Sequence, residues 1–422
     1  MDARRLAIEA IERIIEKQGF THIVVNEFLK KFVLSDEDKA FFTKLTYGTV
    51  ENLLTIEYYL EPYIGKRRQK PWIKYLLYSA VYQLVYLELP AYAVVDEAVS
   101  IAKLRDRNIA NFVNAVLRNF LRNDLREISG FNDIHTLSIK YSYPAWLVSF
   151  LLKDYSYVEV EKIFKEYQKV KDIGVRVNTI KTNKLAVIKT LEDEGIDFRI
   201  SELVDNGLAI KDNIQNNKLL KDGKIIIQDL TAQLVSEVVN PAKNSRVIDL
   251  CSAPGGKASH LSSIMDNTGM IVACDIYPHK IRLMEKLFRK SGNINIKTEL
   301  LDAREVINNY PKASFDYVLA DVPCSGLGVM GHKVDLKYQI NLKAIEEIKV
   351  LQKEILESTW DLVKKDGFYT YSTCTLNKEE NELQIQEFTK ARDDYEIVYE
   401  KTILPFEYGS DGFYICKLRK TK

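Results

Sequence analysis

Two cysteines, Cys324 and Cys374, carry the clearest signs of chemistry in this sequence of 422 residues. Each lies in a polar turn, in the segments ADVPCSGLG and YSTCTL, directly after a run that is typical of a buried strand. A thiol in such a turn is accessible, and a nearby lysine or helix N-terminus lowers its pKa and makes it a nucleophile. Cys274 and Cys416 lie inside apolar runs instead, which suits the commoner role of cysteine as a small buried hydrophobic residue.

A zinc site is the other use that two cysteines in turns can have. The sequence contains no C-x-x-C pair, and no histidine is spaced to complete a ligand set. We therefore expect no bound metal and favour nucleophilic chemistry at a thiolate.

A glycine-rich turn follows another predicted strand, residues 246–250. Gly255 and Gly256 would let a ligand approach the backbone closely. The turn has neither the G-x-G-x-x-G spacing of dinucleotide-binding folds nor the G-x-x-x-x-G-K-[ST] pattern of a phosphate-binding loop, so an ordinary strand–helix connection is the alternative interpretation. The residues of the turn are Cys251, Ser252, Ala253, Pro254, Gly255, Gly256 and Lys257.

Aspartates stand at the ends of the neighbouring predicted strands. Asp275 lies about 20 residues beyond the glycine turn, where an acid accepts hydrogen bonds from ribose hydroxyls in nucleotide-binding folds. Asp302 and Asp321 end the next two runs. Acids at successive strand ends suggest a bound nucleoside, which supplies hydroxyl and amino donors. Capping of the following helix is the alternative for each acid taken singly.

The runs that carry these residues alternate with helical sequence. Residues 246–250, 270–276, 315–322 and 367–373 are strand-like, and each is separated from the next by a helical or loop segment. This alternation predicts a parallel, doubly wound α/β sheet over residues 236–422. Because ligands bind outside the carboxyl ends of the strands in such sheets, we expect the turn, the acids and the two cysteines at one edge.

The rest of the chain is predicted to form two further domains. Over residues 1–135, apolar residues recur at helical spacing, which predicts a compact all-α domain with short connections. Residues 72–89 are apolar all round and belong in the middle of that bundle. Over residues 136–235, short β-branched runs and an amphipathic helix at 184–196 predict a small α+β domain.

Composition excludes several classes of protein. The chain has 60 Lys and Arg against 59 Asp and Glu, so any nucleic-acid site must be a local patch rather than a uniformly basic surface. No apolar run reaches the roughly 18 residues that a membrane helix needs. Five cysteines are sparse and odd in number, unlike a disulfide framework, which favours the reducing cytoplasm. We expect a monomer.

One basic cluster precedes the predicted helix at 72–89 and is a candidate for phosphate contacts. A solvated loop is the commoner role of such a charge run. Arg118 and Arg122 share a helical face and could extend the cluster. The cations of the cluster are Lys66, Arg67, Arg68 and Lys70.

Together, the segments DLCSAPGGKASHL, ACDI, ADVPCSGLGVM and YSTCTLNKEENE resemble the RNA 5-methylcytosine methyltransferases, which use S-adenosylmethionine. The N-terminal segments DKAFFTKLTYGTVEN, VDEAVSIAK and NFVNAVLR resemble the NusB-like RNA-binding domain. The segments YPAWLV, VRVNT and QDLTAQLV resemble the linker domain of the bacterial RsmB (Sun, Fmu) family, which methylates a cytosine of small-subunit ribosomal RNA. The resemblance implies a NusB-like helical domain, an α+β linker domain and a Rossmann-like class I methyltransferase domain.

The resemblance also implies roles for the candidate residues. Cys374 would be the attacking nucleophile, and Cys324 would assist breakdown of the covalent adduct or act near the proton that is removed. The DNA enzymes use the cysteine equivalent to Cys324 as nucleophile, so the opposite assignment stays open. Asp321 would contact the target base, and Lys257 would support the thiolate unless it is only a solvated lysine at a helix start. The cofactor site would consist of residues 251–257, Asp275 for the ribose, Asp302 for the adenine amino group, and Asp321.

Two other functions remain open, namely a tRNA cytosine methyltransferase and a non-catalytic RNA-binding or antitermination factor with an idle fold. The intact cysteines and glycine turn favour an enzyme, and by resemblance the NusB-like region favours ribosomal RNA. The segment MGHKVDLKY departs from the family, with Gly331 and His332 in place of an arginine pair and Val334 in place of a proline. Glu51 stands where relatives tend to have arginine. Loss of the arginine pair is expected to weaken phosphate contacts, which leaves methyl transfer in place but the exact RNA site open.

Overall fold

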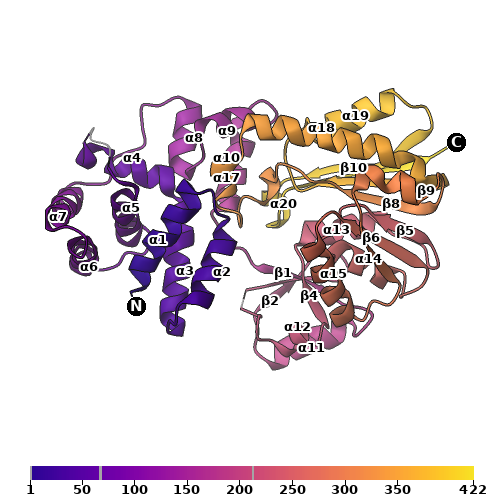
Figure 1. The fold of residues 1–422 in the computed structure, drawn as a ribbon, viewed down its shortest axis with the longest axis horizontal. Helices are drawn as coiled ribbons and strands as arrows, with labels where there is room; N and C mark the ends of the chain where they lie inside the picture. Colours follow the sequence, from indigo (N-terminus) through magenta and orange to yellow (C-terminus); the bar gives the residue numbers. More distant parts are fainter. Residues whose placement is uncertain (1, 66–68, 212) are drawn as a thin grey trace. The chain divides into compact units, whose positions relative to one another are not determined.

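The computed structural model describes residues 2–65, 69–211 and 213–422. The chain divides into two compact units (Figure 1). The helical unit consists of Met1–Gln168 and Met330–Asn341, and the α/β unit consists of Lys169–Val329 and Leu342–Lys422. Within the described ranges, no helix is long and apolar enough to cross a membrane.

In the helical unit, α3 and α5 begin at the residues where the sequence predicts a helix start. Ser35 caps α3 by accepting a hydrogen bond from the backbone N–H of Asp38, and Pro71 opens the largely buried α5. The helices are α1 (Ala3–Glu16), α2 (Thr21–Lys31), α3 (Asp36–Glu51), α4 (Leu53–Ile64), α5 (Pro71–Val85), α6 (Ala91–Lys103), α7 (Arg107–Leu121), α8 (Asp133–Tyr141), α9 (Ala145–Leu151), α10 (Tyr157–Tyr167) and α17 (Leu336–Gln339).

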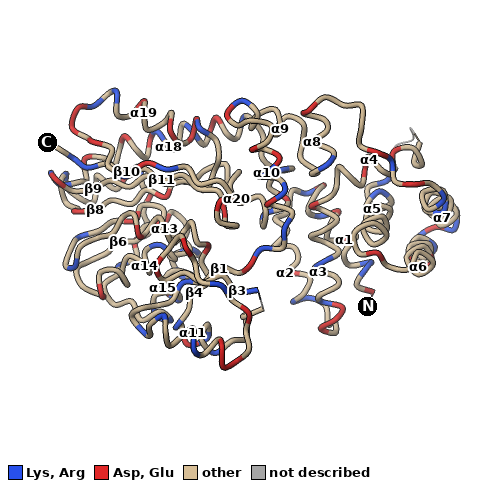
Figure 2. The backbone as a smooth tube through the Cα atoms, turned by 180° about the vertical axis from the view of Figure 1, so that it is seen from behind, with Lys and Arg blue, Asp and Glu red and all other residues tan. Residues whose placement is uncertain are grey.

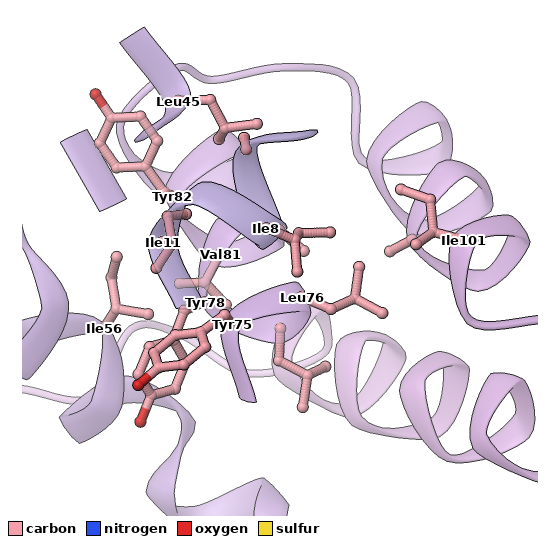
Figure 3. Packing of buried hydrophobic residues seen from close by; sticks show 14 of the residues in the cluster. Ile8, Ile11, Leu45, Ile56, Tyr75, Leu76, Tyr78, Val81, Tyr82 and Ile101 are labelled. Atoms are coloured by element: carbon pink, nitrogen blue, oxygen red, sulfur yellow. The ribbon is translucent and has the colours of Figure 1, made fainter. Parts of the chain in front are cut away.

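The core of the helical unit forms around α5, as the sequence predicts for a helix that is apolar all round. Figure 3 shows Tyr75, Leu76, Tyr78 and Val81 of this helix packed among residues of α1, α3, α4 and α6. Burial of these side chains supplies the main stabilisation of the unit, because each fully buried large apolar side chain contributes about 1.5–3 kcal/mol.

A small antiparallel sheet opens the α/β unit, with the strand order β2-β3-β1-β4. The predicted strands near 174, 198 and 224 are all present, and β3 is a further strand that the sequence reading missed. The elements of this part are β1 (Ile173–Val177), α11 (Lys184–Asp193), β2 (Phe198–Ile200), β3 (Gly207–Ile210), α12 (Lys218–Lys221) and β4 (Ile225–Ile227).

A seven-stranded sheet follows, with the order β10-β11-β9-β8-β5-β6-β7. The strands β9, β8, β5, β6 and β7 run parallel to one another, as predicted. Its strands are β5 (Arg246–Asp249), β6 (Met270–Asp275), β7 (Ile296–Leu300), β8 (Phe315–Asp321), β9 (Val363–Thr373), β10 (Tyr395–Ile403) and β11 (Phe413–Lys420). Its helices are α13 (Leu230–Val239), α14 (Gly256–Ile264), α15 (Pro278–Ser291), η1 (Ala303–Glu305), α16 (Val306–Asn309), η2 (Leu327–Val329), α18 (Leu342–Thr359), η3 (Trp360–Leu362), α19 (Glu382–Lys390) and α20 (Pro405–Tyr408).

The antiparallel hairpin β10–β11 departs from the purely parallel sheet that the sequence predicts. Residues 404–412 between the two strands include only the short α20, and a connection this short joins antiparallel strands, whereas a parallel pair needs a crossover of a dozen or more residues. The hairpin lies at one end of the strand order, so the parallel strands keep their carboxyl ends at a common edge.

Candidate active site

The two candidate cysteines lie side by side in the α/β unit. Strands β8 and β9 pair in parallel, with Asp321 opposite Ser372, so the turns that follow them start at the same level of the sheet. The sulfur atoms of Cys324 and Cys374 are 3.3 Å apart, and both residues are partly exposed. The backbone N–H of Gly328 donates to the carbonyl oxygen of Cys374 at 3.0 Å, which ties the two turns together.

Lys257 and Asp321 form an ion pair beside the cysteines. The Lys257 Nζ lies 2.6 Å from one carboxylate oxygen of Asp321, and Ser372 Oγ donates to the other oxygen at 2.8 Å. Burial lowers the pKa of Lys257, but attraction to Asp321 and to Cys374 outweighs burial and raises the pKa above its ordinary value. Lys257 is therefore a firmly charged, paired cation near Cys374 and not a solvated lysine.

The pKa of the Cys324 thiol is raised well above its ordinary value. The causes are its hydrogen bond with Cys374, its burial, and the negative charges of Cys374 and Glu380. The pair is therefore asymmetric, because Cys374 has a cation nearby whereas Cys324 faces negative charge and keeps its proton. Chemically, this arrangement can provide one thiolate nucleophile and one thiol as a proton donor.

The glycine turn that follows β5 has a backbone that requires its glycine. Gly255 has φ +99°, and a Cβ atom at this position would lie 2.9 Å from the ring of Phe288. The peptide bond between Ala253 and Pro254 is cis. The backbone N–H of Ser252 donates to the carbonyl oxygen of Cys274 at 2.8 Å, which fixes the turn against β6.

Asp249, at the carboxyl end of β5, is a site residue that the sequence reading did not name. It is 1% exposed, and burial raises its pKa to about 7. Among the described residues, no hydrogen bond of ordinary geometry reaches its carboxylate oxygens or the buried Oγ of Ser252, although the Ser252 hydroxyl and the N–H of Cys251 lie close enough to oppose part of the rise in its pKa. Buried acceptors without donors are costly, so this part of the turn fits a ligand that brings positive charge or N–H and O–H donors. The sequence could have indicated this residue, because Asp249 stands between a predicted buried strand and the glycine turn.

Asp275 and Asp302 both accept hydrogen bonds from the segments that follow them. Asp275, 7% exposed, accepts from the N–H of Tyr277 at 3.0 Å and from Lys280 Nζ at 3.3 Å. Asp302 caps η1, and its ion pair with Arg304 at 2.7 Å lowers its pKa. Asp302 therefore has the capping role, whereas Asp275 holds the backbone just before α15, whose N-cap residue Tyr277 has no side-chain cap hydrogen bond.

A buried polar cluster behind the cysteines was also missed by the sequence reading. It links the turn of Cys324 to the turn of Cys374 by hydrogen bonds to the carboxylate of Glu380. The polar run TLNKEENE directly after Cys374 was the signal available, since such a run beside a buried strand needs internal partners. The members of the cluster are Ser325, Gln352, Thr375, Asn377 and Glu380.

The candidate phosphate-binding cations that the structure describes, Lys70, Arg118 and Arg122, lie in the helical unit. Lys66, Arg67 and Arg68 fall outside the described residues. Lys70 is exposed at the start of α5, and Arg118 is exposed on α7. Figure 2 shows Lys and Arg interspersed with Asp and Glu along the chain, which agrees with the nearly balanced charge.

Two of the departures from the family pattern, Val334 and Glu51, belong to the helical unit. Val334 is 5% exposed and belongs to the helical core. Lys337, 2% exposed, donates from Nζ to the backbone carbonyl oxygen of Glu51 at 2.7 Å. These positions therefore serve packing inside this unit. Among the described residues, no group of three or more His, Cys, Asp or Glu could hold a metal ion.

Comparison with protein families agrees with this architecture. Residues 236–419 match the family model of the 16S rRNA methyltransferases RsmB/F, residues 1–122 match the NusB family, and residues 143–216 match the ferredoxin-like domain of RsmF/B-like methyltransferases. The predicted fold class of a NusB-like helical domain, an α+β domain and a Rossmann-like methyltransferase domain is confirmed. The boundaries predicted after residues 135 and 235 stay predictions.

Relatives match along the whole chain. The probable ribosomal RNA small subunit methyltransferase B of Bacillus subtilis is 33% identical, over 99% of this chain and 98% of the relative. The ribosomal RNA small subunit methyltransferase B of Proteus mirabilis is 29% identical, over 99% and 98%. The crystal structure of PH0851 has a TM-score of 0.83 at 27% identity, over 99% of this chain and 98% of that chain. A methyltransferase homolog protein from Pyrococcus horikoshii shares the fold, with a TM-score of 0.62 at 23% identity, over 69% and 100%. The chain belongs to the RsmB family of ribosomal RNA small subunit methyltransferases.

Proposed function

We propose that this protein transfers the methyl group of S-adenosylmethionine to carbon-5 of a cytosine in small-subunit ribosomal RNA. The observation that carries the proposal is the grouping of two cysteines, 3.3 Å apart, with the ion pair of Lys257 and Asp321 at the strand ends. The names of the relatives support ribosomal RNA as the substrate class.

The proposed chemistry begins at Cys374. Its thiolate, stabilised by the charge of Lys257, attacks carbon-6 of the cytosine and forms a carbon–sulfur bond, which turns the ring into an enamine that is nucleophilic at carbon-5. When bound, S-adenosylmethionine supplies an electrophilic methyl group on a sulfonium. Carbon-5 takes this methyl group, and the carbon-5 proton then passes to a water molecule. The electron pair of the broken C–H bond re-forms the double bond between carbon-5 and carbon-6, while the carbon–sulfur bond breaks and the thiolate of Cys374 departs.

Two neighbouring groups have roles in this scheme. Asp321 would accept a hydrogen bond from the cytosine amino group, as acidic side chains do when they recognise cytosine. Cys324 would assist breakdown of the adduct, because its thiol lies 3.3 Å from the sulfur of Cys374 and holds a proton that the departing thiolate can share. The target base must leave its stack or lie in a single-stranded loop to reach these groups.

The glycine turn is the proposed cofactor site. Cys251–Lys257 would line it, with Asp275 toward the ribose, Asp302 toward the adenine and Asp321 nearby. The buried carboxylate of Asp249, which no hydrogen bond of ordinary geometry satisfies, supports this assignment, because a cofactor with a positive sulfonium and an ammonium group would compensate its charge.

Cysteine variants test the function and the assignment of roles together. We expect Cys374→Ser to abolish methylation of small-subunit ribosomal RNA by labelled cofactor. Cys324→Ala should leave a covalent protein–RNA adduct that survives a denaturing gel. Cys416→Ala, which removes a buried thiol of β11, is the matched control and should retain activity.

The same assay separates the alternatives. If Cys374→Ala instead accumulates the covalent adduct and Cys324→Ala forms neither adduct nor product, then Cys324 is the nucleophile and Cys374 assists release. Methylation of tRNA in preference to ribosomal RNA would change the substrate, and RNA binding without any methylation would favour a non-catalytic factor. We also propose a cytoplasmic monomer that needs no metal, which predicts that a chelator leaves the activity unchanged.

A further inference from the structure

Glu380 is a fully buried carboxylate that contacts the turns carrying Cys324 and Cys374. It is 0% exposed and lies in the segment between β9 and α19. One carboxylate oxygen accepts from the N–H of Ser325 and from Gln352 Nε2, both at 2.9 Å. The other accepts from Ser325 Oγ at 2.5 Å and from Asn377 Nδ2 at 3.0 Å. Four donors therefore surround the carboxylate, and no Lys or Arg among the described residues forms an ion pair with it.

The donors come from both cysteine turns. Ser325 follows Cys324 directly, and Asn377 lies three residues after Cys374. The hydroxyls of Ser325 and Thr375 are 2.6 Å apart, and since Ser325 donates to Glu380, it must accept from Thr375. Glu380 thus holds Ser325 in the Cys324 turn directly. In the Cys374 turn it holds Asn377 directly and Thr375 through Ser325.

The backbone of Glu380 is held as well, so the carboxylate has little freedom to follow a moving loop. Its carbonyl oxygen accepts from the hydroxyl of Tyr371 at 2.8 Å, and its N–H donates to the carbonyl oxygen of Asn377 at 3.0 Å. A buried charge is costly unless every donor around it is in place, so the site is stable in one arrangement of the two turns.

We propose that Glu380 is a positioning residue that sets the distance between the sulfur atoms of Cys324 and Cys374. This inference rests on the proposed function, in which Cys324 assists release of the adduct formed by Cys374. Apolar residues could fill the same volume, but they would not fix the direction of the Ser325 backbone and hydroxyl. The negative charge of Glu380 also contributes to keeping Cys324 a thiol.

The first test is Glu380→Gln. An amide has one accepting and one donating end, so one end must face a donor such as Asn377 Nδ2, and the Cys324 turn loses part of its anchor. Because a misplacement of about 1 Å can lower a rate about a hundredfold, we expect kcat to fall by up to about that factor. The KM for S-adenosylmethionine should stay unchanged, and the covalent adduct should accumulate as it does in Cys324→Ala.

Two further variants separate positioning from a general structural role. Glu379→Gln alters the neighbouring, partly exposed acid, which pairs with Lys349, and should behave as the wild type. The double variant Glu380→Gln with Asn377→Asp restores an acceptor opposite the new amide and returns one negative charge to the cluster. We expect it to recover turnover and to remove the accumulated adduct.

A measurement that needs no methylation tests the distance itself. Diamide takes two electrons and two protons from a pair of close thiols and leaves a disulfide between Cys324 and Cys374. Oxidation requires the two sulfur atoms to lie close together, and a buried donor without a partner disfavours that arrangement about tenfold. Loss of the Glu380 charge by itself favours the thiolate, so disulfide formation is measured relative to iodoacetamide alkylation of the same thiols. We expect this ratio to fall by about tenfold in Glu380→Gln and to recover in the double variant.

The outcomes are distinct. Wild-type oxidation and turnover in Glu380→Gln would overturn the inference. Loss of activity that only follows loss of folded protein, with no rescue by the double variant, would also overturn it. If the wild type methylates no RNA but Glu380→Gln still slows oxidation, the proposed function fails while the positioning role of Glu380 stands.

Discussion

Lys257 joins two parts of the site that are far apart in the sequence. It is the last residue of the glycine turn and lies in the first turn of α14, and its partner Asp321 ends β8. The ion pair is only partly exposed, with 15% of the Lys257 side chain and 23% of the Asp321 side chain accessible, so water weakens it less than it would at the surface. The charge of Lys257 is thereby held near Cys374.

Removal of this cation should raise the pKa of the Cys374 thiol, because a positive neighbour favours the thiolate. We expect Lys257→Met to slow methylation by about 100- to 1,000-fold, the usual effect of losing one charge-stabilising group. The pH profile of Cys374 alkylation by iodoacetamide should shift to higher pH. Lys353→Met, on an exposed pair of α18, is the control, and an unshifted profile in Lys257→Met would contradict the role.

Asp249 predicts a pH dependence of cofactor binding. Burial raises its pKa to about 7, so its carboxyl becomes neutral as the pH falls through 7 and no longer attracts a positive ligand. We expect the Kd for S-adenosylmethionine to rise as the pH falls from about 8 to about 6, by up to about tenfold per pH unit below the pKa. Titration calorimetry measures this change, and Asp249→Asn should bind weakly with a flat profile. If the Kd of Asp249→Asn depends on pH as strongly as that of the wild type, a group other than Asp249 causes the pH dependence.

At the scale of elements, parallel pairing brings the site together. The pairing of β8 with β9 places Asp321 opposite Ser372, and the pairing of β5 with β6 places Asp249 opposite Ala273. Each strand ends in a turn that carries a functional group. Because the apolar side chains of these strands are buried, a shift of the pairing register would expose some of them, so the register is fixed. The glycine turn after β5 is one of these connections.

Gly255 and Gly256 give a matched test of that turn. Gly255→Ala would place a Cβ 2.9 Å from Phe288 at φ +99°, whereas the nearest atom for Gly256→Ala is 3.5 Å away, on Gln228, and its φ is not positive. Backbone strain and overpacking together should destabilise Gly255→Ala by about 2–4 kcal/mol, and Gly256→Ala should change stability little. Urea unfolding of both variants without ligand checks this, and equal stability of the two would contradict it.

At the scale of the whole molecule, the chain leaves the α/β unit directly after the Cys324 turn. Met330–Asn341 belongs to the helical unit, and the chain then returns at Leu342. Val334 packs in the helical core, and Tyr338 Oη lies 3.2 Å from Ser142 Oγ. Part of the methyltransferase sequence is therefore built into the folded helical unit, so the stability of this unit constrains a segment that begins six residues after Cys324.

Lys337 gives the helical unit a pH-dependent stability. Burial lowers its pKa to about 7, and the nearby Glu51 opposes this only in part. An unfolded lysine has a pKa of about 10.4, so between about pH 7 and 10 the unfolded chain binds more protons and stability rises with pH. Lys337→Met should remove this rise, as measured by urea unfolding across that range. Lys343→Met, which is exposed, is the control, and an unchanged slope in Lys337→Met would exclude the assignment.

Local pattern predicted much of this protein. The spacing of apolar residues fixes which face of a helix or strand is buried, so α5, the strands β5, β6, β8 and β9, and the fold class all follow from it. Because parallel strands present their carboxyl ends together, the sequence also predicts that Cys324 and Cys374 share an edge. The antiparallel β10–β11 hairpin was missed, because periodicity indicates a strand but not its direction.

Only the tertiary structure decided the contacts. The 3.3 Å separation of the sulfur atoms, the pairing of Lys257 with Asp321 and the carboxylate of Glu380 between the two turns depend on register and packing between segments that are far apart in the chain. The same holds for Glu51 and Lys337, which lie 286 residues apart in the sequence. Residue type and spacing determine which groups can react and which faces are buried, whereas the distances and burial that set their pKa values exist only once the chain has packed.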